Sequence, residues 1–139
     1  METAGEIVAT GLMFPEGPVW VDGDVVVTEI MGGTVARVGV DGAVTRIANT
    51  GGSPNGATVD GAGRIWVTQS GGYGEAARVP PAILCIDPGT GAVDTVATAV
   101  GGVALEGPND LAFGPDGRLW FTDPGGFADP AEYDKAGRI

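Results

Sequence analysis

Residues 14–20 read Phe14-Pro15-Glu16-Gly17-Pro18-Val19-Trp20, and this turn-and-strand unit is written twice more along the chain. The later copies begin Ser53-Pro54-Asn55-Gly56-Ala57-Thr58-Val59-Asp60 and Gly107-Pro108-Asn109-Asp110-Leu111-Ala112-Phe113. A Gly- or Asp-rich turn and a hydrophobic strand follow each copy. Repeats spaced by about 40–50 residues are typical of a modular β architecture such as a propeller.

The first two units each contain four short hydrophobic runs separated by turn sequences. Asp-Gly and Gly-Gly pairs between such runs are strong hairpin signals, because glycine accepts a positive φ. Four antiparallel strands joined in sequence form one propeller blade. The expected strands are residues 16–21, 25–30, 34–40 and 43–48 in the first unit, and 55–60, 64–69, 82–87 and 92–97 in the second.

We therefore predict an all-β fold made of about two and a half four-stranded antiparallel β-propeller blades. Their expected bounds are 14–50, 54–100 and 107–139, where residues 137–139 look like the start of a third strand in the third blade. Propellers close with about four to eight blades, and native proteins avoid leaving a sheet edge exposed. We expect the sequence to be the N-terminal part of a longer protein. The alternative is a short chain that completes a ring by oligomerising.

The composition narrows the class of partner. The chain has a formal net charge of −11 and no histidine, so a nucleic acid is not an expected partner. Its one cysteine, Cys85, cannot form an internal disulfide, which fits a reducing compartment. We see neither a signal peptide nor an apolar stretch long enough to span a membrane. The expected location is the cytoplasm, and no membrane partner is expected.

Three motifs together carry a family resemblance. Glu16-Gly17-Pro18 with Trp20, then Pro54-Asn55-Gly56, then Gly107-Pro108-Asn109-Asp110-Leu111 with Trp120-Phe121-Thr122-Asp123-Pro124 occur in this order. In this respect the chain, from about residue 12 to residue 139, resembles the gluconolactonase / regucalcin / luciferin-regenerating enzyme family. The combination of the first and third motifs is specific, whereas either alone is weak.

The resemblance implies a six-bladed propeller of about twice this length, in line with the blade-type repeats. It also implies a divalent cation, usually calcium, in the central channel, and hydrolysis of a lactone or related ester. Glu16 matches the family's metal ligand of the first blade. Asn109 matches a position that binds metal in some members and substrate in others, and Asn55 matches a polar position that would contact substrate. The remaining ligands, including the Asp expected to activate water, would lie beyond Ile139, so the catalytic residue is unknown and 139 residues would hold only part of the site.

The donor chemistry is consistent with that implication. Glu16 and Asn109 offer hard oxygen donors, which suit calcium or magnesium, whereas zinc usually recruits Cys or His. Asparagine after proline is also a good turn residue, so a purely structural role competes at Asn55 and Asn109. Asp123 follows a strand, where it could line the channel mouth, help to hold a second cation, or cap a loop. Asp60 and Asp116 are expected in hairpin turns.

Two rival interpretations remain open from the sequence. One is a non-catalytic propeller of the NHL-repeat type, which would serve as a binding scaffold and would not need Glu16 and the two asparagines to converge. The other is a propeller enzyme of the strictosidine-synthase type, against which Glu16 argues. Trp20, Trp66 and Trp120 are expected to pack between blades. The loops at 73–81 and 127–136 are candidates for a lid over the channel.

Overall fold

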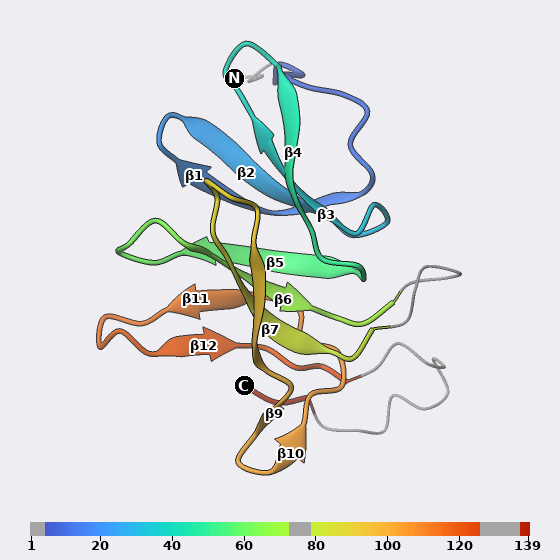
Figure 1. Ribbon diagram of the computed structural model, residues 1–139, viewed down its shortest axis with the longest axis vertical. Helices are drawn as coiled ribbons and strands as arrows, with labels where there is room; N and C mark the ends of the chain where they lie inside the picture. The colour runs from blue at the N-terminus through green and yellow to red at the C-terminus, as the bar shows by residue number, and fades with distance from the viewer. Residues whose placement is uncertain (1–4, 73–78, 126–136) are drawn as a thin grey trace.

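The computed structural model describes residues 5–72, 79–125 and 137–139 (Figure 1). Its regular elements in these ranges are all β-strands. Within the same ranges, no helix has the length and apolar character needed to cross a membrane. Most of the two candidate lid loops, 73–81 and 127–136, falls outside the described residues.

The first two units each form a four-stranded antiparallel sheet, as predicted. In each sheet the strands are hydrogen-bonded in chain order, so each forms a simple meander. The first contains β1 (Pro15–Val21), β2 (Asp24–Glu29), β3 (Thr34–Val38) and β4 (Val44–Asn49). The second contains β5 (Pro54–Val59), β6 (Ile65–Gln69), β7 (Ala82–Ile86) and β8 (Val93–Ala97).

The turn between β1 and β2 shows why the Asp-Gly signal works. Asp22 has φ 49° and Gly23 has φ 91°. Two successive residues with positive φ are what a two-residue type I′ turn requires, and its twist matches that of the flanking strands.

The third unit contributes β11 (Leu111–Phe113) and β12 (Leu119–Phe121), which pair antiparallel. Asp123 then forms an antiparallel bridge with Arg138, as expected if 137–139 begin a third strand. The connection between the second and third units contains two further strands that the expected strand list lacks. It forms a small hairpin of β9 (Ala99–Val100) and β10 (Val103–Ala104). Gly101 and Gly102, with φ 59° and 81°, supply the two positive-φ residues of its turn.

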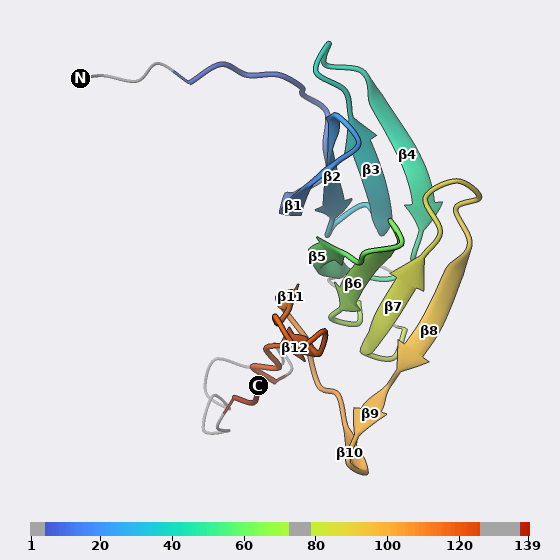
Figure 2. The ribbon, with the colours of Figure 1, turned by 90° about the vertical axis from the view of Figure 1, so that its left-hand side faces the viewer.

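The first strand of each unit lies on the same side of the molecule. Figures 1 and 2 show β1, β5 and β11 one after another, and Figure 2 shows β4 and β8 on the opposite side. The main hydrophobic core joins the first two sheets, since it includes Val26 and Val35 of one and Ile65 and Ile86 of the other. We call β1, β5 and β11, the first strands of the three units, the inner strands. The core packing sets the spacing between the first two of them.

Tryptophan packing between blades is present at one of the three predicted positions. The Trp66 ring meets the Phe113 ring edge to face, with centroids 5.7 Å apart, and so links β6 to β11. Its indole nitrogen also donates to Asp60 Oδ2 at 2.9 Å. Trp20 and Trp120 are 64% and 52% exposed, so in the described residues they do not fill such an interface.

In each unit, a threonine lies at or just after the end of the second strand (β2, β6 or β12), and the residue that follows it is polar and buried. These side chains are Glu29, Gln69 and Asp123, which we call the strand-end anchors; all are at most 3% exposed. Each anchor holds the backbone of the segment that leads into its own unit: Glu29 Oε1 accepts from Met13 N at 2.9 Å, Gln69 Nε2 donates to Thr50 O at 3.0 Å, and Asp123 Oδ1 accepts from Gly107 N at 2.9 Å.

The anchors differ in chemistry because their surroundings differ. Glu29 also accepts from Thr34 Oγ1 at 2.6 Å and from Arg46 Nη2 at 2.9 Å. Burial alone would raise the pKa of Glu29, but the hydrogen bonds from Thr34, Met13 and Arg46 outweigh it, so the pKa is lowered. In the second blade the register places Ala82 opposite Gln69, where Thr34 faces Glu29 in the first. Gln69 Oε1 accordingly has no hydrogen-bond partner among the described residues.

Candidate functional site

The three predicted site residues of the inner strands come together. Glu16 on β1, Asn55 on β5 and Asn109, just before β11, line one pocket of about 230 Å³, which we call the inner-strand pocket. The carboxamides of the two asparagines touch, because Asn55 Nδ2 donates to Asn109 Oδ1 at 2.6 Å. Its lining residues are Glu16, Gly17, Pro18, Asn55, Gly56, Ala57, Asn109 and Asp110.

This convergence depends on glycine following the polar residue in the first two units. Gly17 has φ +50°, and a Cβ there would lie 2.7 Å from Asn55 O and 2.5 Å from Ala57 N. A Cβ at Gly56 would lie 2.8 Å from both Asn109 O and Asp110 Cα. Contacts this short are incompatible with a side chain, so the glycines allow β1, β5 and the start of the third unit to approach one another.

The contact between Asn55 and Asn109 argues against a purely structural turn role for the Asn55 side chain. Turn residues of this chain bond their own local backbone: Asp60 Oδ1 accepts from Ala62 N at 2.9 Å, and Asp116 Oδ1 accepts from Arg118 N at 3.1 Å, as predicted for both. The Asn55 carboxamide instead donates to a side chain of the next unit. The pair therefore joins two blades at the pocket.

Glu16 occupies a different environment from the asparagines. It pairs with Thr28 on β2, and the register shifts between Glu16 and Val19. Such a bulge redirects side chains along the strand. The Glu16 side chain is exposed in the described structure, whereas Asn55 and Asn109 are half-buried, so its charge carries little desolvation cost here.

The electrostatics of the inner-strand pocket favour cations. Two carboxylates, Glu16 and Asp110, line it together with the two carboxamides, and no Lys or Arg is among its lining residues. Asp110 belongs to the third sequence motif, but the sequence predicted no site role for it. The signal that could have identified it is its place directly after Asn109, in the position that glycine occupies in the other two units.

The donor set fits calcium in type. Carboxylate and carboxamide oxygens are what a hard divalent cation prefers. In number the set is short: residues 5–72, 79–125 and 137–139 contain no group of three or more His, Cys, Asp or Glu side chains that could hold a metal ion. Asn109 Oδ1 also already accepts one hydrogen bond, which leaves it one further lone pair for another partner.

Asp123 lies away from the inner-strand pocket. It is 3% exposed, accepts from Glu106 N at 3.2 Å and Gly107 N at 2.9 Å, and lies 3.8 Å from Arg138 Nη2. These contacts match the loop-capping role that the sequence left open beside a cation site.

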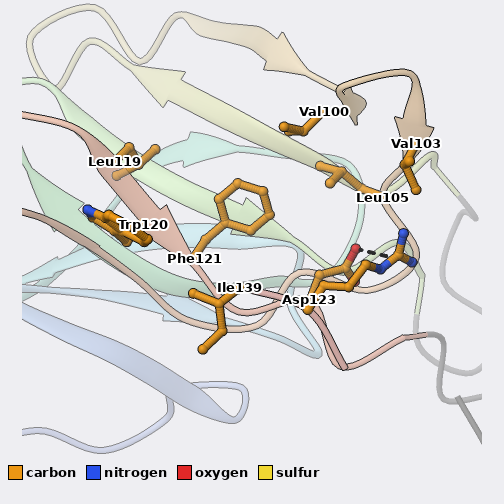
Figure 3. Close-up of a pocket in the computed structure, with 9 residues that line it drawn as sticks. Val100, Val103, Leu105, Leu119, Trp120, Phe121, Asp123 and Ile139 are labelled. Carbon is orange, nitrogen blue, oxygen red and sulfur yellow. Dashed lines mark ion pairs between the residues drawn. The ribbon is translucent and has the colours of Figure 1, made fainter. Parts of the chain in front are cut away.

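Asp123 lines a second pocket of about 360 Å³, bounded by the β9–β10 hairpin and β12. Figure 3 shows Val100, Val103, Leu105 and Phe121 around it, with the ion pair of Asp123 at one end. Its lining is mainly apolar and includes none of Glu16, Asn55 and Asn109. Convergent polar groups distinguish the inner-strand pocket as the candidate site.

The sequence matches one known protein family along nearly its whole length. The family described as the SMP-30/Gluconolactonase/LRE-like region matches residues 14–138. The chain belongs to this family.

The individual relatives are longer than this chain. It is 29% identical to the gluconolactonase of Zymomonas mobilis subsp. mobilis, over 89% of this chain and 37% of that protein. A gluconolactonase from Xanthomonas campestris, described as important in glucose secondary metabolic pathways, superposes with a TM-score of 0.72 at 28% identity, over 86% of this chain and 38% of its own. The chain thus spans less than two fifths of the length of either relative.

The same fold also serves other chemistry. Virginiamycin B lyase from Staphylococcus aureus superposes with a TM-score of 0.63 at 22% identity, over 81% of this chain and 35% of that one. At this identity the similarity shows the fold alone, because one propeller architecture supports many functions.

Proposed function

We propose that the protein containing this chain hydrolyses a lactone or a related ester at the inner-strand pocket, with the help of a divalent cation. The observation that carries the proposal is the convergence of Glu16, Asn55 and Asn109 from three units on one pocket, in a chain of the gluconolactonase family. In the reaction, a water oxygen bonds to the acyl carbon, the ring C–O bond breaks, and a proton moves to the departing ring oxygen.

Glu16 and Asn109 would hold the cation in this proposal. Calcium is the favoured ion, because both side chains offer hard oxygen donors. When bound, it would supply Lewis-acid stabilisation of negative charge on the carbonyl oxygen of the substrate. The ligand set would need further oxygen donors beside these two, since calcium takes about six to eight.

The two carboxamides would orient the substrate. Because Asn55 Nδ2 is bonded to Asn109 Oδ1, the remaining Oδ1 of Asn55 can accept from a hydroxyl group, and Nδ2 of Asn109 can donate to a ring or carbonyl oxygen. A polyhydroxylated lactone offers both kinds of partner. We assign no residue of this chain to water activation.

The test is calcium binding by calorimetry and hydrolysis of gluconolactone, measured on the full-length protein with Glu16→Gln and with Glu6→Gln as control. Both variants remove one negative charge, but Glu6 is exposed and does not line the pocket. We expect Glu16→Gln to weaken calcium binding and hydrolysis at least tenfold, and Glu6→Gln to leave both unchanged. Equal behaviour of the two variants would refute the assignment of Glu16.

A non-catalytic binding propeller is the second candidate. It is favoured by the absence, within the described residues, of a cluster of three acidic or His/Cys ligands. On this alternative the pocket would bind a polar small molecule through Asn55 and Asn109, without turnover and without dependence on calcium. Removal of calcium with a chelator separates the two, since only the hydrolase loses its function.

A further inference from the structure

Two buried hydroxyl groups reach from one blade to the site residue of the next. Thr28 on β2 and Thr68 on β6 are both 0% exposed. Thr28 Oγ1 donates to the backbone oxygen of Asn55, and Thr68 Oγ1 donates to that of Asn109 at 2.6 Å. The same contact therefore occurs twice, each time between adjacent units and each time on an asparagine of the inner-strand pocket.

The surroundings of Thr68 fix the direction of its hydrogen bond. Gly56 N donates to Thr68 Oγ1 at 2.8 Å, so the hydroxyl oxygen is used as an acceptor there. The one hydroxyl proton is then free to go to Asn109 O. Asn109 O also accepts from Gly56 N at 2.7 Å. Thr68, Gly56 and Asn109 thus form a closed set of contacts between the second and third units.

Two further hydrogen bonds, one from the third unit and one from the second, hold the backbone around Asn109. Asn109 N donates to Thr122 O at 2.9 Å, and the preceding carbonyl, Pro108 O, accepts from Ser70 Oγ at 2.7 Å. Ser70 directly follows β6, so the end of this strand holds two successive carbonyls, those of Pro108 and Asn109. With its backbone held at both ends, the position of the Asn109 carboxamide follows from the position of β6.

A packing role alone would not require a hydroxyl at these positions. Valine has almost the same shape as threonine and an equal preference for strands, and burying a hydroxyl without a partner is costly. The hydroxyl is thus explained by the bond that it makes, and that bond ends on the backbone of a pocket residue.

We propose that Thr28 and Thr68 are positioning residues, which act on Asn55 and Asn109 from the preceding blade and set the geometry of the carboxamide pair in the inner-strand pocket. This inference rests on the proposed function for its effect on catalysis. The positioning itself can be tested without that function, because the NMR signals of the two carboxamides report their geometry directly.

The test compares Thr68→Val, Thr68→Ser and Thr50→Val in the full-length protein. Thr50 is the matched control: its hydroxyl also donates to a backbone carbonyl, that of Gly33 at 3.1 Å, but neither residue lines the pocket. The readouts are the side-chain amide NMR signals of Asn55 and Asn109, kcat and KM for gluconolactone, and the thermal midpoint.

We expect Thr68→Val to shift both pairs of carboxamide signals and to lower kcat/KM about tenfold, since small misplacements of site groups are costly to catalysis. Thr68→Ser should restore both readouts to near the wild-type values, because it keeps the hydroxyl. Thr50→Val should lower the thermal midpoint without moving either site readout.

Unchanged carboxamide signals in Thr68→Val, with a lower thermal midpoint like that of Thr50→Val, would overturn the inference and leave Thr68 a purely structural residue. If the wild-type protein hydrolyses no lactone, the proposed function fails instead. The carboxamide signals then still decide the positioning role, so the two failures are distinguishable.

Discussion

Asn55 and Asn109 lie 54 residues apart in the chain, yet Nδ2 of the first donates to Oδ1 of the second at 2.6 Å. They belong to different units, so this bond closes the inner edge of a blade interface. It also fixes how each carboxamide faces the pocket, because one amide hydrogen and one carbonyl lone pair are already engaged. What remains for a ligand is the carbonyl oxygen and one amide hydrogen of Asn55, together with both amide hydrogens and one carbonyl lone pair of Asn109.

The first prediction concerns this pair. In a double-mutant cycle with Asn55→Ala and Asn109→Ala, we expect a coupling of roughly 1 kcal/mol in the free energy of unfolding, as residues in direct contact usually show. Urea unfolding of the wild type, both single variants and the double variant measures it. Additive effects would mean that the bond contributes nothing to the interface.

The second prediction concerns the close approach at Gly56. Gly56→Ala should destabilise the protein by roughly 1–3 kcal/mol, because the added methyl would meet backbone atoms that cannot move independently. Gly61→Ala is the control, since a Cβ at Gly61 has nothing within 4 Å, and its effect should stay within about 0.5 kcal/mol. Thermal unfolding of both variants gives the comparison. Similar midpoints would show that the units do not pack as closely as described.

The third prediction follows from the lowered pKa of Glu29. A carboxyl group whose pKa is lower in the folded state than in the unfolded state stabilises the protein at pH values above its ordinary pKa of 4.5. This contribution is lost as the pH falls through the folded-state pKa. The difference in unfolding free energy between wild type and Glu29→Gln should therefore be largest at neutral pH and shrink on acidification. A difference that is constant with pH would contradict it.

The fourth prediction concerns Asp60. The hydrogen bond from the Trp66 indole, with further help from Arg64 and Ala62, lowers its pKa from 3.8 to about 2. The ionised Asp60 therefore stabilises the protein fully above pH 3.8, and this stabilisation is lost as the pH falls from 3.8 to about 2. The indole Nε1–H NMR signal of Trp66 should stay constant on acidification to about pH 3, where an ordinary aspartate would already be protonated. Movement centred near 3.8 would disprove the shift, and Asp60→Asn serves as the non-titrating reference.

The fifth prediction contrasts two strand-end anchors. Gln69→Glu would place a carboxylate where the facing residue is Ala82 rather than a hydroxyl donor. We expect a loss of more than about 2 kcal/mol in unfolding free energy, because a buried charge without partners is strongly unfavourable. Urea unfolding at neutral pH measures it. A stability equal to wild type would indicate that the buried site hydrates or rearranges.

Much of the fold was predictable because its signals are local. Asp22-Gly23 specifies its own turn through two positive φ values, and period-2 strands between such turns define the blades. The β9–β10 hairpin was missed, since two-residue strands carry no periodicity and only Gly101-Gly102 marks the turn.

The convergence of three residues on the candidate site was predictable for the same reason. Repetition of one motif placed Glu16, Asn55 and Asn109 at matching positions, and matching positions meet at one edge. The roles of Thr68 and Gln69 were not predictable. Each depends on which residue of another strand faces it, and register between strands distant in sequence is set by the tertiary packing.

The hydroxyl contacts from Thr28 to Asn55 and from Thr68 to Asn109 have a consequence for how such a chain can change over generations. In the second and third units, a hydroxyl group of the preceding unit positions the asparagine of the pocket. A duplicated or transplanted blade would arrive with its asparagine but without the hydroxyl that aligns it. The pocket is therefore retained only when two adjacent blades are inherited together. Recombination between the two would keep the fold but remove the hydroxyl group that positions the asparagine.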